Sequence, residues 1–451
     1  MSGLVSRLNS FLSRNHKDKR EELLWKETRE VIEGYLGLPE MHFLESCIDC
    51  NACAPSCPFY NAVDKLYAPA RMANEMRKLY KKTSTISGKI LGSLVGAKLP
   101  KNEDEIKVML DLAYHCSNCG ACYYTCPHGV DSGTVIAMLR SVLFRYGLAP
   151  SIINLLARLE LRVIDSPWRS LMYEWNSVLE ELSSNHNVAK KDEADYLILL
   201  DIFNVFVNRE NIEAYLEVLD AANIKYAFPD RPLGVRPPLP LTVGHYETAR
   251  KVADFVYSYA VMNNFRNILV LDGGYPYNDL KYAYTYYRAS KPKDLDIIHV
   301  AQLIYESYLY EGLPAFTQWG KATYIPSCNI DTRGGIGAAS KLVEITARPY
   351  EKHLIWPYAG VGWMSLLCPY VREKLSIYLG IDLVLFEEGV EEQLISDMRQ
   401  VARYLAKEAY RTSTGYHVFG CIDDIIVLKA SKAENVNPIH LSQWLKQHLL
   451  K

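Results

Sequence analysis

Two cysteine-rich runs with one shared spacing limit what this chain can fold into more than any other feature. Each run holds four cysteines and is followed by a proline: Cys47, Cys50, Cys53, Cys57 and Pro58, then Cys116, Cys119, Cys122, Cys126 and Pro127. Both read C-x2-C-x2-C-x3-C-P. The two-residue gaps let a tight turn aim three sulfurs at one centre, whereas the fourth sulfur cannot curl back to the same centre.

This spacing is typical of the [4Fe-4S] clusters of bacterial ferredoxins, in which the fourth cysteine of a run ligates the other cluster. A cubane cluster needs one thiolate for each iron. We therefore expect two [4Fe-4S] clusters with crossed ligand sets. The sets are Cys47, Cys50, Cys53 and Cys126 for one cluster, and Cys116, Cys119, Cys122 and Cys57 for the other.

Two other interpretations of the cysteines fit less well. Disulfides would need an oxidising compartment, and we expect no signal peptide at the start of the chain. Zinc sites usually pair two CxxC units or add histidine, and they do not need a four-cysteine run followed by proline. Two runs of identical spacing therefore favour iron–sulfur clusters.

Composition sets limits on the rest of the chain. The 451 residues are 49% hydrophobic and 23% charged, as in ordinary soluble proteins with sizeable cores. A formal charge of −2 argues against nucleic acid as a partner. The most apolar stretches, such as 268–271, are strand-sized and too short to span a bilayer. We therefore expect any work at a membrane to be done from its surface.

We expect the first 40 residues to form an N-terminal amphipathic helical segment. Apolar residues recur three and four positions apart from Leu4 to Leu12, with Arg7 among them and Arg14 just after, and Glu21–Leu36 gives a second helical stretch. Such a segment could lie on a membrane surface, dock on a partner or cover its own domain.

Residues 41–150 are expected to form a helical, ferredoxin-like domain that holds both clusters. Periodic apolar residues predict helices over 69–80, 103–114 and 135–146. The last of these has cap residues at Asp131–Thr134 and a closing glycine at Gly147. The stretch between the first two helices, 81–101, is basic and contains three glycines.

Residues 43–150 resemble the iron–sulfur domain found in the C and D subunits of heterodisulfide reductase. The resemblance rests on the long spacer between the runs, the Cys-Gly-Ala-Cys centre at 119–122, the segment 126–131, and the trailing Leu139-Arg140 and Gly147–Pro150. The same domain occurs in the C subunit of anaerobic glycerol-3-phosphate dehydrogenase and in the K subunit of the dissimilatory sulfite reductase complex. In fused members, two repeats of the pattern C…CCG…CxxC follow, which can bind an unusual iron–sulfur cluster that handles a disulfide.

The C-terminal part is expected to alternate strand and helix after a helical linker at 151–190. Apolar, β-prone runs predict strands at 196–200, 268–271, 322–325 and 416–419. Helical patterns lie between them at 212–222, 248–262 and 391–410. Such alternation is typical of a layered α/β domain, here 191–451, so the whole chain is expected to be α+β.

This α/β domain is expected to contain two internal repeats. The segment Ile298–Leu303 matches Ile439–Trp444. Each segment lies about twenty residues beyond an apolar strand that ends in a loop. Each segment places a histidine, His299 or His440, at the start of a short helix. We interpret both histidines as structural caps and not as ligands.

The repeats differ from the family pattern in having lost most cysteines. In the first repeat the CxxC position reads Gly273–Tyr277, without cysteine. In the second, Pro357–Met364 stands where CCG is expected, and Cys421–Asp424 stands where CxxC is expected. The three remaining cysteines are Cys328, Cys368 and Cys421. We expect them to be buried as small apolar side chains and the C-terminal domain to hold no iron, although a cluster or redox pair among them stays open.

A glycine-rich stretch after the third predicted strand, Arg333–Gly337, lacks the G-x-G-x-x-G register of dinucleotide sites. We interpret Gly334, Gly335 and Gly337 as turn residues that need positive φ, and we expect the same of Gly360 and Gly362.

The sequence predicts an iron–sulfur electron-transfer subunit of a respiratory oxidoreductase complex, without catalytic residues of its own. Its two clusters would relay electrons between a catalytic subunit, such as a hydrogenase, a sulfur-metabolising enzyme or a dehydrogenase, and a membrane cytochrome b-like or quinone-reactive subunit. A catalytic heterodisulfide or thiol reductase, and a scaffold with structural clusters, are the alternatives. We expect a cytoplasmic location, peripheral to that face of the membrane.

Overall fold

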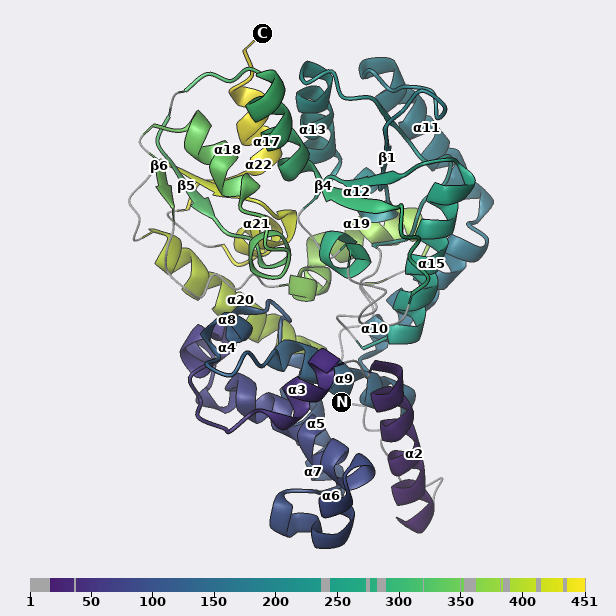
Figure 1. Ribbon diagram of the computed structural model, residues 1–451, viewed down its shortest axis with the longest axis vertical. Coiled ribbons are helices and arrows are strands. Elements are labelled where there is room, and N and C mark those ends of the chain that lie inside the picture. Colours follow the sequence, from purple (N-terminus) through teal and green to yellow (C-terminus); the bar gives the residue numbers. More distant parts are fainter. Residues whose placement is uncertain are drawn as a thin grey trace.

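Figure 1 shows the computed structural model of the chain, in which a body of two sheets and their helices stands above an all-helical body. The structure describes residues 17–35, 38–236, 244–272, 276–281, 289–318, 320–348, 350–352, 362–381, 383, 390–410, 415–432 and 436–450. The expected helix within residues 1–16 and the segment 353–361 lie outside these ranges. The predicted mixture of helix and sheet is confirmed.

The lower body is built around α5, which packs against α2, α7 and α9. Its helices are α2 (Lys17–Tyr35), α3 (Leu38–Glu45), α4 (Pro58–Ala62), α5 (Pro69–Ser84), α6 (Ile86–Leu91), α7 (Glu103–Tyr114), α8 (Ala121–Thr125) and α9 (Ser132–Arg145), with short 3-10 turns η1 (Ala54–Ser56), η2 (Lys65–Tyr67) and η3 (Gly92–Val95). The helices predicted over 69–80, 103–114 and 135–146 are confirmed. The basic stretch 81–101 contains α6 and η3, which were not predicted.

Local chemistry explains where α9 begins and ends. Asp131 is its N-cap, and the carboxylate accepts a hydrogen bond of 3.2 Å from the backbone N–H of Thr134. Gly147 follows the helix with a φ of 71°, which ends it at low cost. The helix begins three residues before the predicted start at Val135, and it ends one residue before the predicted end at Tyr146.

Two helices then lead to the upper body: α10 (Ser151–Asp165) and α11 (Arg169–Asn185). Glu160 on α10 is fully buried, and its carboxylate accepts hydrogen bonds from the backbone N–H groups of Val235 (2.8 Å) and Arg236 (2.6 Å). This carboxylate ties the linker to a loop of the upper body.

The upper body contains two parallel four-stranded sheets with the orders β2-β1-β3-β4 and β6-β5-β7-β8. The strands are β1 (Tyr196–Ile198), β2 (Tyr226–Ala227), β3 (Asn267–Val270), β4 (Asp296–His299), β5 (Ala322–Ile325), β6 (Tyr350–Lys352), β7 (Tyr416–Phe419) and β8 (Pro438–His440). The helices are α12 (Ile202–Phe206), α13 (Arg209–Ala221), α15 (Tyr246–Met262), α17 (Val300–Glu311), α18 (Ala338–Thr346), α19 (Pro369–Leu379), α20 (Val390–Tyr410), α21 (Ile422–Ala430) and α22 (Leu441–Gln447), with the turns η4 (Cys328–Thr332) and η5 (Gly362–Leu367).

The four predicted strands correspond to β1, β3, β5 and β7, which are the inner strands of the two sheets. Inner parallel strands are buried on both faces and read as continuous apolar runs. The four outer strands were not predicted; β8 (Pro438–His440), for example, is three residues long and partly polar.

The two sheets repeat one plan. Each inner pair is extended by a strand that ends in a histidine, with Val270 paired to His299 and Phe419 paired to His440. His299 caps α17 by accepting from the N–H of Ala301 at 3.1 Å, and His440 caps α22 in the same way. The cap interpretation of both histidines is therefore confirmed.

One expectation about the glycine-rich stretch is wrong in part. Gly335 has a φ of 67°, but Gly337 has a φ of −76° and Gly334 is not among the positive-φ glycines. At Gly334 the constraint is space, because an added Cβ would lie 2.5 Å from the carbonyl oxygens of Asn329 and Ile330. Gly360 lies outside the described residues.

Candidate iron–sulfur centre

The two cysteine runs have left-handed backbone conformations at the same two positions. In the first, Asp49 and Asn51 have left-handed φ angles of 60° and 57°. In the second, the residues at the same two places, Asn118 and Gly120, have φ angles of 56° and 79°. Asn, Asp and Gly are the residues that adopt this region most readily. The two runs therefore have the same left-handed turns at matching positions between their first three cysteines.

The last cysteine of each run leaves this curl. Cys57 is extended (φ −87°, ψ 122°) and is the N-cap of α4, which Pro58 starts. Cys126 is likewise extended (φ −79°, ψ 118°) and ends α8. Thr125 donates a hydrogen bond of 3.1 Å to Ser56, so the ends of the two runs lie against each other.

Electrostatic coupling reports which thiols are neighbours. Burial raises the pKa of the Cys57 thiol, and the charges of Cys119 and Cys116, from the other run, raise it further. Burial also raises the pKa of Cys53, with added contributions from Cys47 and from Cys126 of the other run. The pKa of a thiol in each run therefore responds to charge on thiols of the other run.

The donor set fits iron–sulfur clusters better than free thiols. Burial raises the pKa of Cys119 to about 11, so this thiol would stay protonated and unreactive without a cation. Bound iron would supply the positive charge that stabilises the thiolates. Among the described residues, no three His, Cys, Asp or Glu side chains converge on one ion. A cube, in which each thiolate binds its own iron, does not need such convergence.

A buried arginine lies beside the first run. Arg77 on α5 donates to the carbonyl oxygen of Phe43 at 3.1 Å and is 5% exposed. Burial lowers its pKa, but the charges of Cys47, Asp49 and Cys53 act in the opposite direction. The lower body thus supplies its own positive charge next to these thiols.

A second arginine reaches the other run from the upper body. Arg333 follows η4, and its Nε donates to the carbonyl oxygen of Asn118 at 2.7 Å. One of its terminal nitrogens donates to Asn118 Oδ1 at 2.6 Å, and the other donates to Asp131 Oδ2 at 2.9 Å. A Cβ at Gly120 would lie 2.9 Å from the side chain of Arg333, and one at Gly133 would lie 2.6 Å from it. Both glycines leave the space that this side chain occupies.

Other residues of the upper body, from the part that contains the sheet β6-β5-β7-β8, also contact the second cysteine run and its neighbouring residues. Tyr124 donates to the carbonyl oxygen of Thr332, and His115 Nε2 lies 3.0 Å from Asp397 Oδ2 on α20. Burial disfavours the charged ring of His115, but Asp111 and Asp397 outweigh it and raise the pKa to about 9. In Figure 1, α20 passes beside α4 and α8 at this junction.

The three cysteines of the upper body have different surroundings. Cys328, Cys368 and Cys421 are all buried. Cys328 packs against Cys119 of the second run, whereas Cys368 is the N-cap of α19. Cys421 donates a hydrogen bond of 3.4 Å to Asp423. Their burial matches the expectation from the sequence.

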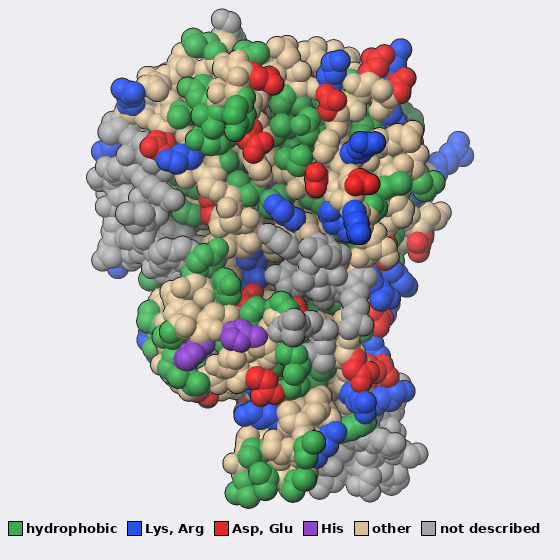
Figure 2. Space-filling view, in the orientation of Figure 1, with side chains coloured by type: hydrophobic (Ala, Val, Ile, Leu, Met, Phe, Trp, Pro, Cys, Tyr) green, Lys and Arg blue, Asp and Glu red, His purple; other side chains and the backbone are tan. Residues whose placement is uncertain are grey.

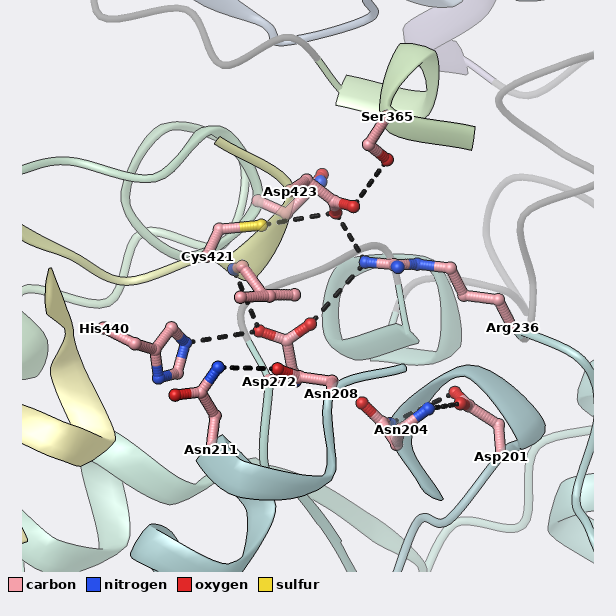
Figure 3. Close-up of polar contacts among 12 residues, drawn as sticks. Asp201, Asn204, Asn208, Asn211, Arg236, Asp272, Ser365, Cys421, Asp423 and His440 are labelled. Carbon is pink, nitrogen blue, oxygen red and sulfur yellow. Dashed lines mark hydrogen bonds and ion pairs between the residues drawn. The ribbon is translucent and has the colours of Figure 1, made fainter. Parts of the chain in front are cut away.

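A buried ion-pair network lies at the carboxyl ends of the two sheets (Figure 3). Arg236 contacts Asp423 at 2.5 Å and Asp272 at 3.5 Å, and His440 lies 3.6 Å from Asp272. Ser365 donates to Asp423. Burial raises the pKa of Asp272, but His440 and Arg236 lower it more, so this carboxyl stays charged. Ionic groups therefore fill the place where the two repeats meet.

Sequence reasoning missed Arg77, Arg140 and Arg333 as functional residues. Arg140 donates to the carbonyl oxygens of Ala113 and Cys116 and so holds the start of the second run. Arg333 lies in the glycine-rich stretch, and neither the dinucleotide motif nor the turn interpretation of that stretch gives its side chain a role. The only sequence signal for a role of Arg333 is that a cationic residue stands next to glycines.

Comparison with known proteins agrees with the cysteine geometry. Residues 43–130 match the 4Fe-4S dicluster domain. Over 107 residues, 24% of this chain, it is 36% identical to iron–sulfur subunit 2 of an Hdr-like menaquinol oxidoreductase from Archaeoglobus fulgidus, of which 19% is covered. Over 128 residues, 28% of this chain, it is 27% identical to the D subunit of dihydromethanophenazine:CoB–CoM heterodisulfide reductase from Methanosarcina mazei, of which 30% is covered.

In this region the chain is similar to the iron–sulfur subunits of heterodisulfide reductase-like complexes. The matched stretches span about a fifth and just under a third of these two relatives. No solved structure matches the chain. Within the part of the chain that the structure describes, every helix is too short or too polar to cross a bilayer.

Proposed function

We propose that this heterodisulfide reductase-like chain is the electron-transfer subunit of a respiratory redox complex, with 41–150 as its cluster-binding domain. One observation carries the proposal: the ends of the two cysteine runs lie against each other, joined by the hydrogen bond from Thr125 to Ser56. When bound, two [4Fe-4S] clusters would supply one-electron redox steps at these thiols. If each cysteine run supplies ligands to both clusters, the two clusters lie close together, as electron transfer between them requires.

The ligand sets are part of this proposal. One cluster takes Cys47, Cys50, Cys53 and Cys126, and the other takes Cys116, Cys119, Cys122 and Cys57. The pKa couplings of Cys57 to Cys116 and Cys119, and of Cys53 to Cys126, support this crossed assignment.

The protein's own residues prepare the two sites differently. Arg77 places a positive charge near the first run from within the lower body. Arg333 places one near the second run from the upper body. A nearby cation favours the reduced, more negative state of a cluster, so each arginine raises the reduction potential of its neighbour. Only the reduction potential of the second cluster then depends on the position of the upper body relative to the lower body.

The names of the relatives suggest the partner class. One is a subunit of a menaquinol oxidoreductase, and the other is a subunit of a dihydromethanophenazine-dependent heterodisulfide reductase. We propose that this chain passes electrons between a catalytic subunit and a membrane subunit that reacts with a lipid-soluble carrier. The domain 191–451 would then serve for docking, with the chain at the cytoplasmic face of the membrane.

A catalytic heterodisulfide or thiol reductase is the second candidate. It is favoured by Cys328, whose buried thiol packs against Cys119 of the second run and so lies next to a proposed cluster ligand. Against it, Cys421 is hydrogen-bonded to Asp423, and Cys368 caps a helix.

The crossed ligand sets are tested by Cys57→Ala and Cys126→Ala in the full-length holoprotein, prepared without oxygen. EPR spectra of the reduced variants should each lose or alter one cluster signal. Cys57→Ala should resemble Cys119→Ala, and Cys126→Ala should resemble Cys50→Ala. If Cys57→Ala instead resembles Cys50→Ala, each run holds its own cluster and the assignment is wrong.

A further inference from the structure

The tip of the lower body carries large apolar side chains that point into solvent. On α6 and η3, Ile86 is 78%, Ile90 is 76% and Leu94 is 86% exposed, and Leu91 is half-exposed. Figure 2 shows hydrophobic side chains gathered at the lower end of the molecule, where Figure 1 draws α6. We call these four residues the apolar tip.

The exposure of the apolar tip does not come from a loose segment. Thr85 caps α6 by accepting from the N–H of Gly88 at 3.0 Å, and its hydroxyl donates to the carbonyl oxygen of Lys81 at 2.8 Å. Lys81 also donates to the carbonyl oxygen of Val95 at 3.3 Å. A Cβ at Gly88 would lie 1.9 Å from the Lys81 carbonyl oxygen, so this close approach needs glycine. The fold thus holds the apolar side chains outward on a fixed base.

The chain segment that contains the apolar tip is basic. Between Met76 and Asn102 the chain contains six lysines and no acidic residue. Lys78 and Lys98 pair with Glu75 and Glu105.

Two other lysines, Lys82 and Lys89, form no ion pair with a carboxylate among the described residues, whereas the backbone N–H of Lys101 donates to the carboxylate of Glu105. Lys89 lies 5.7 Å from the ring centre of Trp25 on α2, which brings an aromatic side chain to the same end of the molecule. Apolar side chains with lysines and tryptophan beside them are typical of surfaces that bind lipid interfaces.

We propose that the apolar tip inserts into a lipid surface that carries negative charge. The four side chains would enter the boundary between headgroups and acyl chains, and Lys82 and Lys89 would meet anionic headgroups. The inference deepens the proposed function, because it names the surface by which an electron carrier without a membrane-spanning helix among its described residues would stay at a membrane.

Lipid fits this surface better than protein does. A second copy of the chain would bring the same lysines together, which is unfavourable. A stable protein interface buries about 800 Å² on each side, far more than four side chains on one short helical hairpin can offer. A bilayer needs only shallow entry of a protruding element.

The test is sedimentation of the full-length holoprotein with vesicles of phosphatidylcholine alone, or with a third of phosphatidylglycerol. We expect binding to the anionic vesicles and at least about tenfold less to the neutral ones. The double variant Ile90→Ser/Leu94→Ser should bind the anionic vesicles at least about tenfold less well, since each side chain loses most of its transfer free energy. The variant Lys82→Gln/Lys89→Gln should lose the preference for anionic lipid.

A matched control replaces exposed apolar residues elsewhere. Met262 and Tyr310 on the upper body are 81% and 85% exposed, and Met262→Ser/Tyr310→Ser should bind vesicles as the parent protein does. Equal loss in this control, equal binding to neutral vesicles, or concentration-dependent dimers that the tip variant abolishes would each overturn the proposal. Cluster absorbance and reduction by dithionite, measured on the same samples, report on electron transfer separately.

Discussion

Replacing Arg333 by glutamine should loosen the junction between the upper body and the second cysteine run by about 3 kcal/mol or more. The guanidinium contacts Asn118 and Asp131, and the two ion-pair side chains are only 11% and 8% exposed. Breaking a buried pair by removing one partner typically costs about 3–5 kcal/mol, because the other charge stays buried. Glutamine carries no charge and cannot reach both residues.

An exposed pair provides the comparison. Lys341 lies 2.8 Å from Glu344, with side chains 53% and 48% exposed. Pairs on the surface are screened by water and contribute little to stability, so Lys341→Gln is a matched control. Asp131→Asn and the double variant complete a double-mutant cycle with Arg333→Gln, in which we expect a coupling energy of about 1.5 kcal/mol or more.

The assay is denaturant unfolding of the holoprotein without oxygen, followed by cluster absorbance and by tryptophan fluorescence. If Arg333→Gln costs no more than Lys341→Gln, or if the coupling with Asp131 is zero, the buried pair does not hold the junction. A second readout is the EPR-monitored potential of each cluster. The variant should lower one potential only, and Arg333→Lys, which keeps the charge, should restore part of it.

Two further predictions concern iron content and pH. The full-length holoprotein should contain about eight irons, and Cys328→Ser/Cys421→Ser should leave that number unchanged; about twelve would instead favour the reductase candidate. Burial raises the pKa of Glu160 from 4.5 to about 7, so its contribution to stability is fully present below pH 4.5 and is lost as the pH rises through 7. In the Glu160→Gln variant, the fall in unfolding free energy over this pH range should therefore be smaller by roughly 3 kcal/mol. An unchanged slope in pH-dependent unfolding curves would contradict the burial of an ionisable group there.

Local signals made the cysteine runs, their flanking helices and the inner strands predictable. The start of α4 is predicted by the adjacent Cys57 and Pro58, and the start of α9 is predicted by the cap residue Asp131. The strands β3 and β5 are predicted by continuous apolar runs. The left-handed residues Asp49, Asn51 and Asn118 also carry a local signal, but it lies in the residues between the cysteines and not in the cysteine spacing.

Contacts between distant parts of the chain were not predictable in the same way. Arg333 and Asp131 are 202 residues apart, and His115 and Asp397 are 282 apart. Each looks like an ordinary charged residue until the fold brings its partner to it. The outer strands were missed for a related reason, since β2 and β8 depend on hydrogen bonds to an inner strand and little on their own composition.

The repeated strand order of the two sheets implies that the upper body arose by duplication of one unit. Duplication frees one copy from a task that the other still performs. Here Thr332, Arg333 and Asp397, all in the second unit, make the hydrogen bonds to the second cysteine run. Purifying selection should therefore be stronger on the turn after β5 than on its counterpart after β1, and the two copies should accumulate substitutions at different rates.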